Sequence, residues 1–282
     1  MRKLENTRLF YIKPLLKDIN SNKNVFVDMH VHTSYTDGMM NVEKIVQKAR
    51  KYGIGIAITD HNHIQGALEL SQVKDVFSIP GIEVAGKEGI HILIYFYTYP
   101  DLQKFYRKHI EPNKIKEKFT MLKVKTIDII KTARKFKCVI CAAHPFGPGA
   151  TGLARKIHGE MMNEVILEGL DAIEIMNGSM FRGHNNKALK FGQVINLGIT
   201  GGSDAHTTKE IGGTMTYANC SKTISAFLDA VVKNKNKVIG KESHILYKPY
   251  TKIMLLRDVA RSPILYSKYH MNLVKKKLGI KK

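Results

Sequence analysis

The feature that most limits the fold of this chain is an alternation of short apolar runs with amphipathic segments. Runs with the length and the Val- and Ile-rich composition of β-strands lie at residues 24–30, 54–60, 76–84, 90–97, 137–143, 170–176 and 198–203. Segments with helical periodicity lie between most of them, at residues 41–52, 64–73, 113–136, 160–169 and 183–196. The first of these has Asn41 as an N-cap and Gly53 just past its end. This order predicts βα units around a parallel sheet or barrel, and therefore an α/β fold.

Residues that commonly bind metals flank nearly all of these predicted strands. The stretch "VDMHVHTSYTDG" contributes His30, His32 and Asp37. The other strand ends contribute His61, Glu83, His91, His144, Asp204 and His206. Because the carboxyl ends of parallel strands meet on one face, we expect these nine side chains to share one cleft. A lone His-x-His is more often structural, but nine buried polar groups without a ligand would be costly, and bound cations would compensate them.

The positive charge of the chain is unevenly distributed. The formal net charge is +21, and residues 1–24, 104–137 and 241–282 carry +4, +9 and +9, which leaves −1 for the rest. Such segments attract polyanions, namely nucleic acid, acidic lipid or a phosphorylated substrate, although solvated helix faces would have the same composition. We expect 104–137 to be a lysine-rich helical insertion broken near Pro112. We expect 250–282 to be a basic helical tail, interrupted at Pro263, that packs on the body rather than on a membrane.

Other features of the sequence favour a cytoplasmic protein. The N-terminus "MRKLENTRLF" lacks the apolar core of a signal peptide. The longest apolar runs, such as "IHILIYFY", are shorter than the roughly 18 residues that span a bilayer. Three cysteines do not form a disulfide framework, and we interpret Cys138 and Cys141 as core thiols because a spacing of three in a strand places them on opposite faces.

The strand-end residues also carry a family resemblance. The stretches "DMHVHTSYTDG", "ITDHN", "GIEV", "GIHILIY", "AAHP" and "GGSDAH" resemble, in order, the motifs of the PHP family, named for its polymerase and histidinol phosphatase members. The resemblance extends from about residue 25 to 212. It implies a distorted (β/α)7 TIM-like barrel, a cluster of two to three divalent metal ions and hydrolysis of phosphate esters.

The resemblance also implies roles for individual residues. The nine strand-end residues fall on the family's ligand positions, and Glu83 falls where a carboxylate bridges two metals. His63 departs from the pattern, and we interpret it as incidental or as supporting the ligands. Outside the resemblance we expect an N-terminal extension at 1–24, a PHP domain at 25–240 that includes the insertion, and a tail at 241–282.

The ligand types indicate the metal and the chemistry. Mixed imidazole and carboxylate ligands suit Mn²⁺, Zn²⁺ or Fe²⁺ better than Mg²⁺ or Ca²⁺, and the resemblance ranks manganese first. Bound metal would activate water to a hydroxide that attacks phosphorus directly. Asp37 and His206 are candidate catalytic residues as well as ligands, and Arg155 and Arg182 are candidates for holding phosphate. His184 and Lys209 are weaker candidates, and no organic cofactor is predicted.

Several functions fit this pattern. A phosphoric ester hydrolase of the phosphatase or exonuclease type, acting on a nucleotide or short oligonucleotide, agrees with the basic insertion. A small-metabolite phosphatase of the histidinol-phosphatase type is the alternative. A nucleic-acid-binding module with a structural metal cluster is disfavoured, because the sequence shows no basic patch interleaved with aromatic residues.

Overall fold

The computed structural model describes most of the chain before residue 244. The described residues are 9–12, 14, 24–115, 118–147, 151–154, 165 and 169–243. The chain divides into two compact units, Met1–Ser243 and His244–Lys282. Several predictions fall outside the described residues. They concern the tail from residue 244, most of the N-terminal extension, nearly all of the helix at 160–169, and Arg155.

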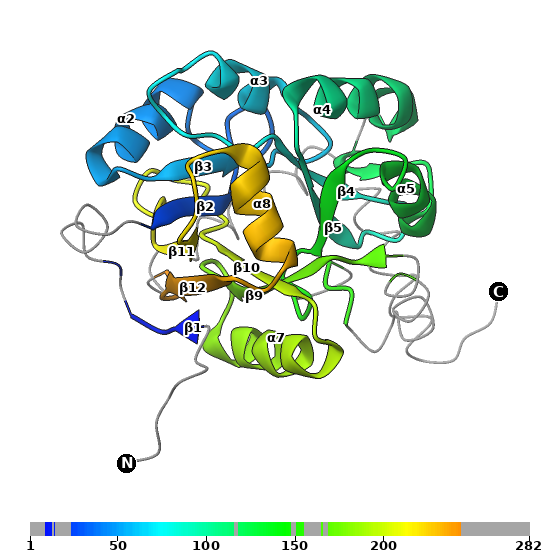
Figure 1. The fold of residues 1–282 in the computed structure, drawn as a ribbon. Helices are drawn as coiled ribbons and strands as arrows, with labels where there is room; N and C mark the ends of the chain where they lie inside the picture. Colours follow the sequence, from blue (N-terminus) through cyan, green and yellow to red (C-terminus); the bar gives the residue numbers. More distant parts are fainter. Residues whose placement is uncertain are drawn as a thin grey trace. The chain divides into compact units, whose positions relative to one another are not determined.

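Two five-stranded sheets form the centre of the first unit (Figure 1). The first sheet has the order β1 (Leu9–Phe10), β12 (Asn236–Gly240), β11 (Thr214–Ala218), β2 (Val25–Val31) and β3 (Gly55–Ile58). The second has the order β10 (Gly198–Gly202), β9 (Ala172–Asn177), β8 (Cys138–Ala142), β5 (His91–Phe96) and β4 (Gly81–Ala85). All seven predicted strands are therefore present, and the predicted α/β class is confirmed.

The sheets are mixed, so the prediction of a wholly parallel arrangement was wrong. Strands β8, β9 and β10 are parallel, as are β2 and β3, but β5 runs antiparallel to both β4 and β8. The segment between β4 and β5 is a short turn in which Gly89 has a φ of 81°. A parallel crossover needs a dozen or more residues, so this turn can only make a hairpin.

The two sheets approach each other through isolated bridges rather than a continuous ladder. These bridges pair Val31 with Ala205, Ile56 with Ser78 and His61 with Glu83. Within the described ranges no closed barrel is formed, so the predicted (β/α)7 barrel is present only as a mixed α/β arrangement of two adjoining sheets.

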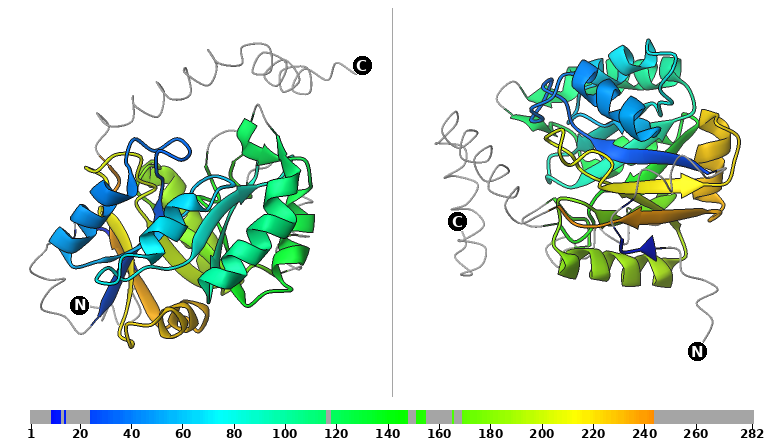
Figure 2. Two further views of the ribbon diagram at one scale, coloured as in Figure 1. Left: turned by 90° about the horizontal axis from the view of Figure 1, so that it is seen from above. Right: turned by 90° about the vertical axis from the view of Figure 1, so that its left-hand side faces the viewer.

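Helices lie around the outside of the strands. They are α2 (Val42–Tyr52), α3 (Gln65–Ser71), α4 (Tyr99–Phe105), α5 (Thr126–Ala133), α7 (Arg182–Ile195) and α8 (Ile224–Val232). Helices α2 and α7 lie on opposite sides of the strands (Figure 2). Helix α2 begins where the side chain of Asn41 accepts a hydrogen bond from the Lys44 N–H, and it ends at Gly53, whose φ is 65°. Its buried face packs the core with Val42, Ile45, Val46 and Ala49.

The basic insertion at 104–137 is only partly helical, and the predicted helix after Pro112 is replaced by strands between Lys114 and Leu122. A π-helical turn (Tyr106–Ile110) and a 3-10 turn (Glu111–Asn113) follow α4. A hairpin of β6 (Lys114–Ile115) and β7 (Lys118–Leu122) comes next, and only α5 is helical after it. Pro112 cannot donate a helical hydrogen bond, and Leu122 is fully buried, so this segment gains more by packing as a strand. The Lys87 N–H donates to the Val124 carbonyl at 2.8 Å, which attaches the hairpin just beyond the carboxyl end of β4.

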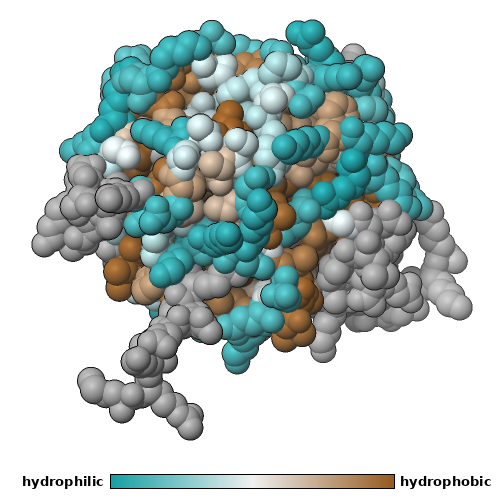
Figure 3. Space-filling view, viewed as in Figure 1, coloured by the Kyte–Doolittle hydropathy of each residue, from teal (hydrophilic) through white to brown (hydrophobic). Residues whose placement is uncertain are grey.

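Both cysteines of β8 are free thiols, as predicted. Cys141 is buried and Cys138 is partly buried. On the face seen in Figure 3, hydrophilic residues lie mostly toward the rim, and hydrophobic residues are exposed in small areas between hydrophilic ones. None of the helices in the described residues is long and apolar enough to cross a bilayer.

Candidate metal centre

The structure brings all nine predicted ligand residues together. Eight of them lie in or just after β2, β3, β4, β8 and β10, at or near the carboxyl ends of these strands. His91 instead begins β5, and it joins the others because β5 runs antiparallel to β4 and β8. No side chain among the nine is more than 17% exposed. The cluster is therefore buried, at the carboxyl ends of β2, β3, β4, β8 and β10.

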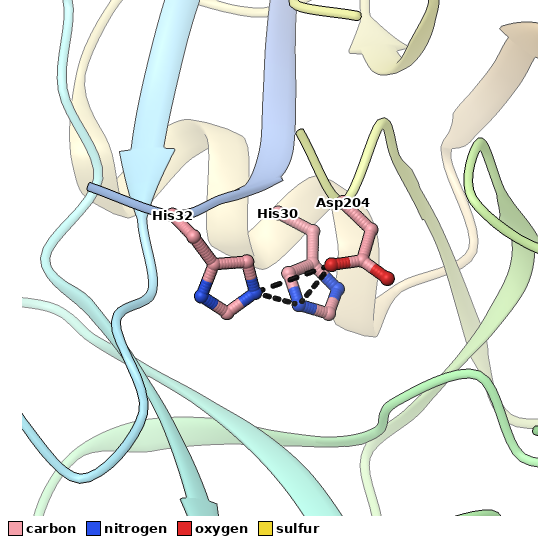
Figure 4. A group of neighbouring side chains, drawn as sticks. All are labelled: His30, His32 and Asp204. Atoms are coloured by element: carbon pink, nitrogen blue, oxygen red, sulfur yellow. Dashed lines mark hydrogen bonds and ion pairs between the residues drawn. The ribbon is translucent and has the colours of Figure 1, made fainter. Parts of the chain in front are cut away.

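His30, His32 and Asp204 form the innermost group (Figure 4). The Nε2 atoms of the two histidines lie 3.1 Å apart. The Asp204 Oδ1 atom lies 3.5 Å from His30 Nε2 and 3.2 Å from His32 Nε2. All three side chains thus direct a ligand atom at one common point.

Glu83 connects two parts of the cluster. Its Oε1 atom lies 3.0 Å from His91 Nδ1 and 3.3 Å from His144 Nε2. Its Oε2 atom lies 2.9 Å from His61 Nδ1 and 3.5 Å from the Nε2 atoms of both His30 and His32. The two oxygens of one carboxylate therefore face different sets of histidines, as a bridging ligand must.

Asp37 and His206 lie nearest to solvent, and His61 lies beside Asp37. The Asp37 Oδ2 atom is 3.1 Å from His206 Nε2 and 3.4 Å from His61 Nε2. Asp37 and His206 have the most exposed side chains of the nine, at 17% and 14%. A molecule that enters from solvent would therefore meet this pair first.

The spacing of these atoms fits metal coordination. Ligands at about 2.0–2.2 Å from a tetrahedral or octahedral ion lie about 3.0–3.5 Å from one another. The Nε2 atoms of His30 and His32 fall in this range, although two imidazole nitrogens without a shared proton repel each other. Four overlapping groups of three could each hold an ion: His30, His32 and Asp204; His32, Asp37 and His206; His32, His61 and Glu83; Glu83, His91 and His144. The donor set fits a cluster of more than one divalent ion.

The electrostatics of the metal-free cluster also favour metal binding. Burial alone would raise the pKa values of Asp37 and Glu83, but the neighbouring histidines hold both well below their usual range. Burial alone would lower the pKa of His206, but Asp37 and Asp204 raise it to about 10. The cluster thus retains protons on histidines to balance three carboxylates, and a metal ion would take the place of those protons.

The backbone is strained at two of the candidate ligands. His144 has a φ of 25° and Asp204 has a φ of 52°, a region that non-glycine residues rarely adopt. Just before Asp204, strand β10 passes close to β2, and a Cβ atom on Gly202 would lie 2.4 Å from the Cβ of His30. Only glycine at this position lets the two strands bring His30 and Asp204 together.

Glu174 on β9 supports the cluster, and the sequence did not identify it. It is 1% exposed, and its Oε1 atom lies 3.0 Å from His30 Nδ1. Its Oε2 atom accepts hydrogen bonds from the backbone N–H of His144 at 2.8 Å and from the amide of Asn177 at 2.9 Å. The sequence signal that could have identified Glu174 is a carboxylate inside the apolar run "DAIEIMNG".

Two buried aspartates hold the ligand loops, and the sequence did not identify them either. Asp60 accepts hydrogen bonds from the Thr33 N–H and hydroxyl, both at 2.6 Å, and so fixes the loop between His32 and Asp37. Asp28 accepts from the N–H and hydroxyl of Ser203 at 2.8 and 2.6 Å, which ties β2 to the loop that carries Asp204. Burial raises the pKa of Asp28 to about 6, against the effect of these hydrogen bonds.

Of the two predicted phosphate-binding arginines, the structure describes Arg182, and its partners are not members of the cluster. Arg182 opens α7, and its guanidinium forms two hydrogen bonds with the Glu242 carboxylate, at 2.5 and 2.6 Å. It also lies over the Tyr11 ring at 4.2 Å. Arg155 lies outside the described residues. Of the weaker candidates, His184 lies on α7 beside Phe181, and Lys209 lies in the turn after His206.

Comparison with family models gives two matches. Residues 28–145 match the PHP domain, and residues 182–236 match a domain described as PHP-associated. The first match contains seven of the nine clustered residues, and the second contains Asp204 and His206. No curated protein sequence matches the chain significantly.

Solved structures resemble this fold. A two-domain protein from Bacteroides vulgatus, described as containing a PHP-like metal-dependent phosphoesterase, is 17% identical with a TM-score of 0.57, covering 84% of this chain and 69% of that one. Endonuclease Q from Pyrococcus furiosus is 18% identical with a TM-score of 0.63, covering 76% of this chain and 57% of its own. Endonuclease Q bound to a 27-mer duplex with an abasic lesion at the active site is 17% identical with a TM-score of 0.62, covering 78% and 60%. At these identities the likeness establishes a shared fold.

Proposed function

Because this chain belongs to the PHP family of metal-dependent phosphoesterases, we propose that it hydrolyses phosphate esters of nucleotides or short nucleic acids. The observation that carries this proposal is the bridging position of Glu83, whose two oxygens face His91 and His144 on one side and His61 on the other. Around it the nine residues would hold two to three divalent ions, with manganese the first choice and zinc or iron next.

The nine residues would have different roles according to how deeply they are buried. Divalent ions held by these nine residues would supply a water of lowered pKa as the nucleophile and would stabilise the charge on the phosphoryl oxygens. His30 and His32 are 0% and 1% exposed and would be the innermost metal ligands. Asp37 and His206 face the solvent side, where His206 Nε2 lies 3.1 Å from Asp37 Oδ2. With His32, this pair would hold the ion that an arriving phosphate ester meets first.

The nucleotide class is supported by the surroundings of the cluster. The hairpin β6–β7 is attached just beyond the carboxyl end of β4, the strand that carries Glu83. Lys114 of the hairpin, and Lys123 and Lys125 just after it, therefore lie near the carboxyl end of β4. Endonuclease Q, which shares the fold, acts on a DNA duplex with an abasic lesion. Positive charge near a phosphoesterase centre favours a polyanionic substrate over a small metabolite.

Turnover of simple esters tests the proposal. Protein stripped with chelator and then given Mn²⁺, Zn²⁺ or Fe²⁺ is assayed with p-nitrophenyl phosphate and with the p-nitrophenyl ester of thymidine 5′-monophosphate. We expect metal-dependent release of nitrophenol that Glu83→Gln abolishes and Asp75→Asn leaves unchanged, because Asp75 pairs with Arg50 at an exposed site. Turnover of the monoester alone would favour a metabolite phosphatase, and no turnover with any metal would contradict the proposal.

A further inference from the structure

An aromatic stack lies beside the metal centre, and neither the ligand set nor the family match accounts for it. The rings of Tyr35 and His63 are stacked, with centroids 5.3 Å apart and an angle of 13° between their planes. Tyr35 is nevertheless 44% exposed, which makes it one of the few exposed large apolar side chains in the described residues. His63 lies against one face of the Tyr35 ring, so the opposite face is the one that a ligand could meet.

The chain itself fixes the stack at the rim of the cluster. Tyr35 is two residues before Asp37, and His63 is two residues after His61. Two residues of chain span at most about 7 Å, so each stacked residue has a candidate metal ligand within that reach. The loop under Tyr35 is held by Asp60, which accepts hydrogen bonds from Thr33 and from the Thr36 hydroxyl at 3.0 Å. The stack therefore has a fixed position relative to the cluster.

Each ring is also held in orientation. The Tyr35 hydroxyl donates a hydrogen bond to Glu69 on α3. His63 Nδ1 accepts a hydrogen bond from the Gln65 N–H at 3.2 Å, and its ring meets the Tyr106 ring edge-on, with centroids 6.3 Å apart. Neither ring has to be ordered when a ligand arrives, which lowers the entropic cost of binding.

A positive charge borders the stack. Lys114 on the basic hairpin donates a hydrogen bond to the Tyr106 hydroxyl at 3.0 Å, and its Nζ atom lies 5.2 Å from the centre of that ring. A nucleotide fits this arrangement. Its base could stack on the aromatic face, and its phosphate could lie at the metal cluster with the ammonium group nearby.

We propose that the exposed face of Tyr35, backed by His63, binds the nucleobase of the substrate by stacking while its phosphate lies at the metal cluster. This inference rests on the proposed function, because it names a part of the substrate of that same site. Base-on-aromatic stacking tolerates any base, since every base has a π-face. The site should therefore distinguish nucleotides from phosphorylated sugars but not one base from another.

Equilibrium binding tests the stack without relying on turnover. Calorimetry on the Mn²⁺-loaded protein compares adenosine 5′-monophosphate with ribose 5-phosphate, which differ only in the base. We expect the wild type to bind the nucleotide roughly tenfold more tightly, and Tyr35→Ala to lose this preference. Tyr35→Phe, which keeps the ring but not the bond to Glu69, should keep the preference, and Tyr35→Leu, which keeps bulk without a π-face, should lose most of it.

Kinetics on a matched pair of esters separates this inference from the proposed function. The p-nitrophenyl esters of thymidine 5′-monophosphate and of the corresponding abasic sugar phosphate share their leaving group and their phosphodiester. The ratio of their kcat/KM values should fall roughly tenfold in Tyr35→Ala and stay at the wild-type value in Tyr52→Ala, a tyrosine on α2. If both esters are hydrolysed and Tyr35→Ala does not change the ratio of their kcat/KM values, the proposed base stacking is wrong but the proposed phosphoesterase activity stands. A wild type that binds the two phosphates equally well would also overturn it.

Discussion

The Nδ1 atom of His30 lies 3.0 Å from Oε1 of Glu174, a residue 144 positions further along the chain. Because this contact occupies one ring nitrogen, it sets the tautomer of His30 and points Nε2 at His32 and Asp204. A carboxylate behind a ligand histidine also makes the imidazole a stronger donor. Glu174 thus prepares the innermost ligand without being one.

Replacing Glu174 should weaken metal binding while leaving the ligands in place. In Glu174→Gln the amide keeps the shape of the side chain but loses the charge, and we expect the metal affinity to fall about 10- to 100-fold. Competition with a chromogenic chelator measures this affinity. The control is Glu242→Gln, which removes the partner of Arg182 and should leave the affinity at the wild-type value. An equal loss in both variants would contradict a specific role for Glu174.

Replacing Glu83 should remove more than one metal ion. Its two oxygens face His91 and His144 on one side and His61 on the other, so two ions would lose a ligand together. Elemental analysis after reconstitution with Mn²⁺ should find two to three equivalents in the wild type and at least one fewer equivalent in Glu83→Ala than in His91→Ala. Wild-type protein that retains less than about one equivalent would rule out a metal cluster.

Adding one methyl group at Gly202 should disturb both stability and the site. The Cβ atom of alanine would lie 2.4 Å from the Cβ of His30, closer than two carbons can approach. We expect Gly202→Ala to lower the free energy of unfolding by about 1–3 kcal/mol and to weaken metal binding, because β10 must move away from β2. Urea denaturation and chelator competition check the two effects. Gly183→Ala is the control, since nothing lies within 4 Å of its added Cβ.

Metal removal should make stability fall as pH rises. In the metal-free protein Asp37 and Asp204 outweigh burial and raise the pKa of His206 to about 10, against a value of about 6.5 in the unfolded chain. The stability from this raised pKa is complete below pH 6.5 and is lost progressively as pH rises toward 10. The melting temperature of chelator-treated protein should therefore fall between about pH 7 and pH 9. The melting temperature of metal-loaded protein should fall less, because the metal replaces the proton on His206. A melting temperature of metal-free protein that rises between pH 7 and pH 9 would contradict the expectation.

The basic hairpin should matter for oligonucleotides more than for mononucleotides. Each phosphate contacted on a single strand contributes about −0.7 to the slope of log affinity against log salt. Changing Lys114, Lys123 and Lys125 to Gln should flatten the salt dependence of kcat/KM for a short RNA and affect a mononucleotide less. The control changes three lysines on α2: Lys44, Lys48 and Lys51. Equal effects of the two triple variants would show that the hairpin lysines are only a solvated surface.

The sequence alone predicted the nine residues that the structure brings together, because the signals for them are local. Hydrophobic periodicity located the strands, and each candidate ligand, from His30 to His206, lies in or beside one of them. The convergence of strand ends then followed from the α/β pattern, without knowledge of how any two side chains touch. The same local reasoning expected a helix at 113–136, where residues 114–122 form a hairpin, because burial of Leu122 depends on β4 and not on nearby sequence.

Only the tertiary structure decided what surrounds those ligands. It joined Glu174 to His30 across 144 positions, and it brought His91 to the cluster by reversing β5. It also assembled the aromatic and basic group that the sequence did not show, with Tyr35, His63, Tyr106 and Lys114 contributed by four separate segments. The physical reason is that a residue type and its periodicity are properties of neighbouring positions, whereas a supporting hydrogen bond or a ring stack exists only after distant segments have packed together.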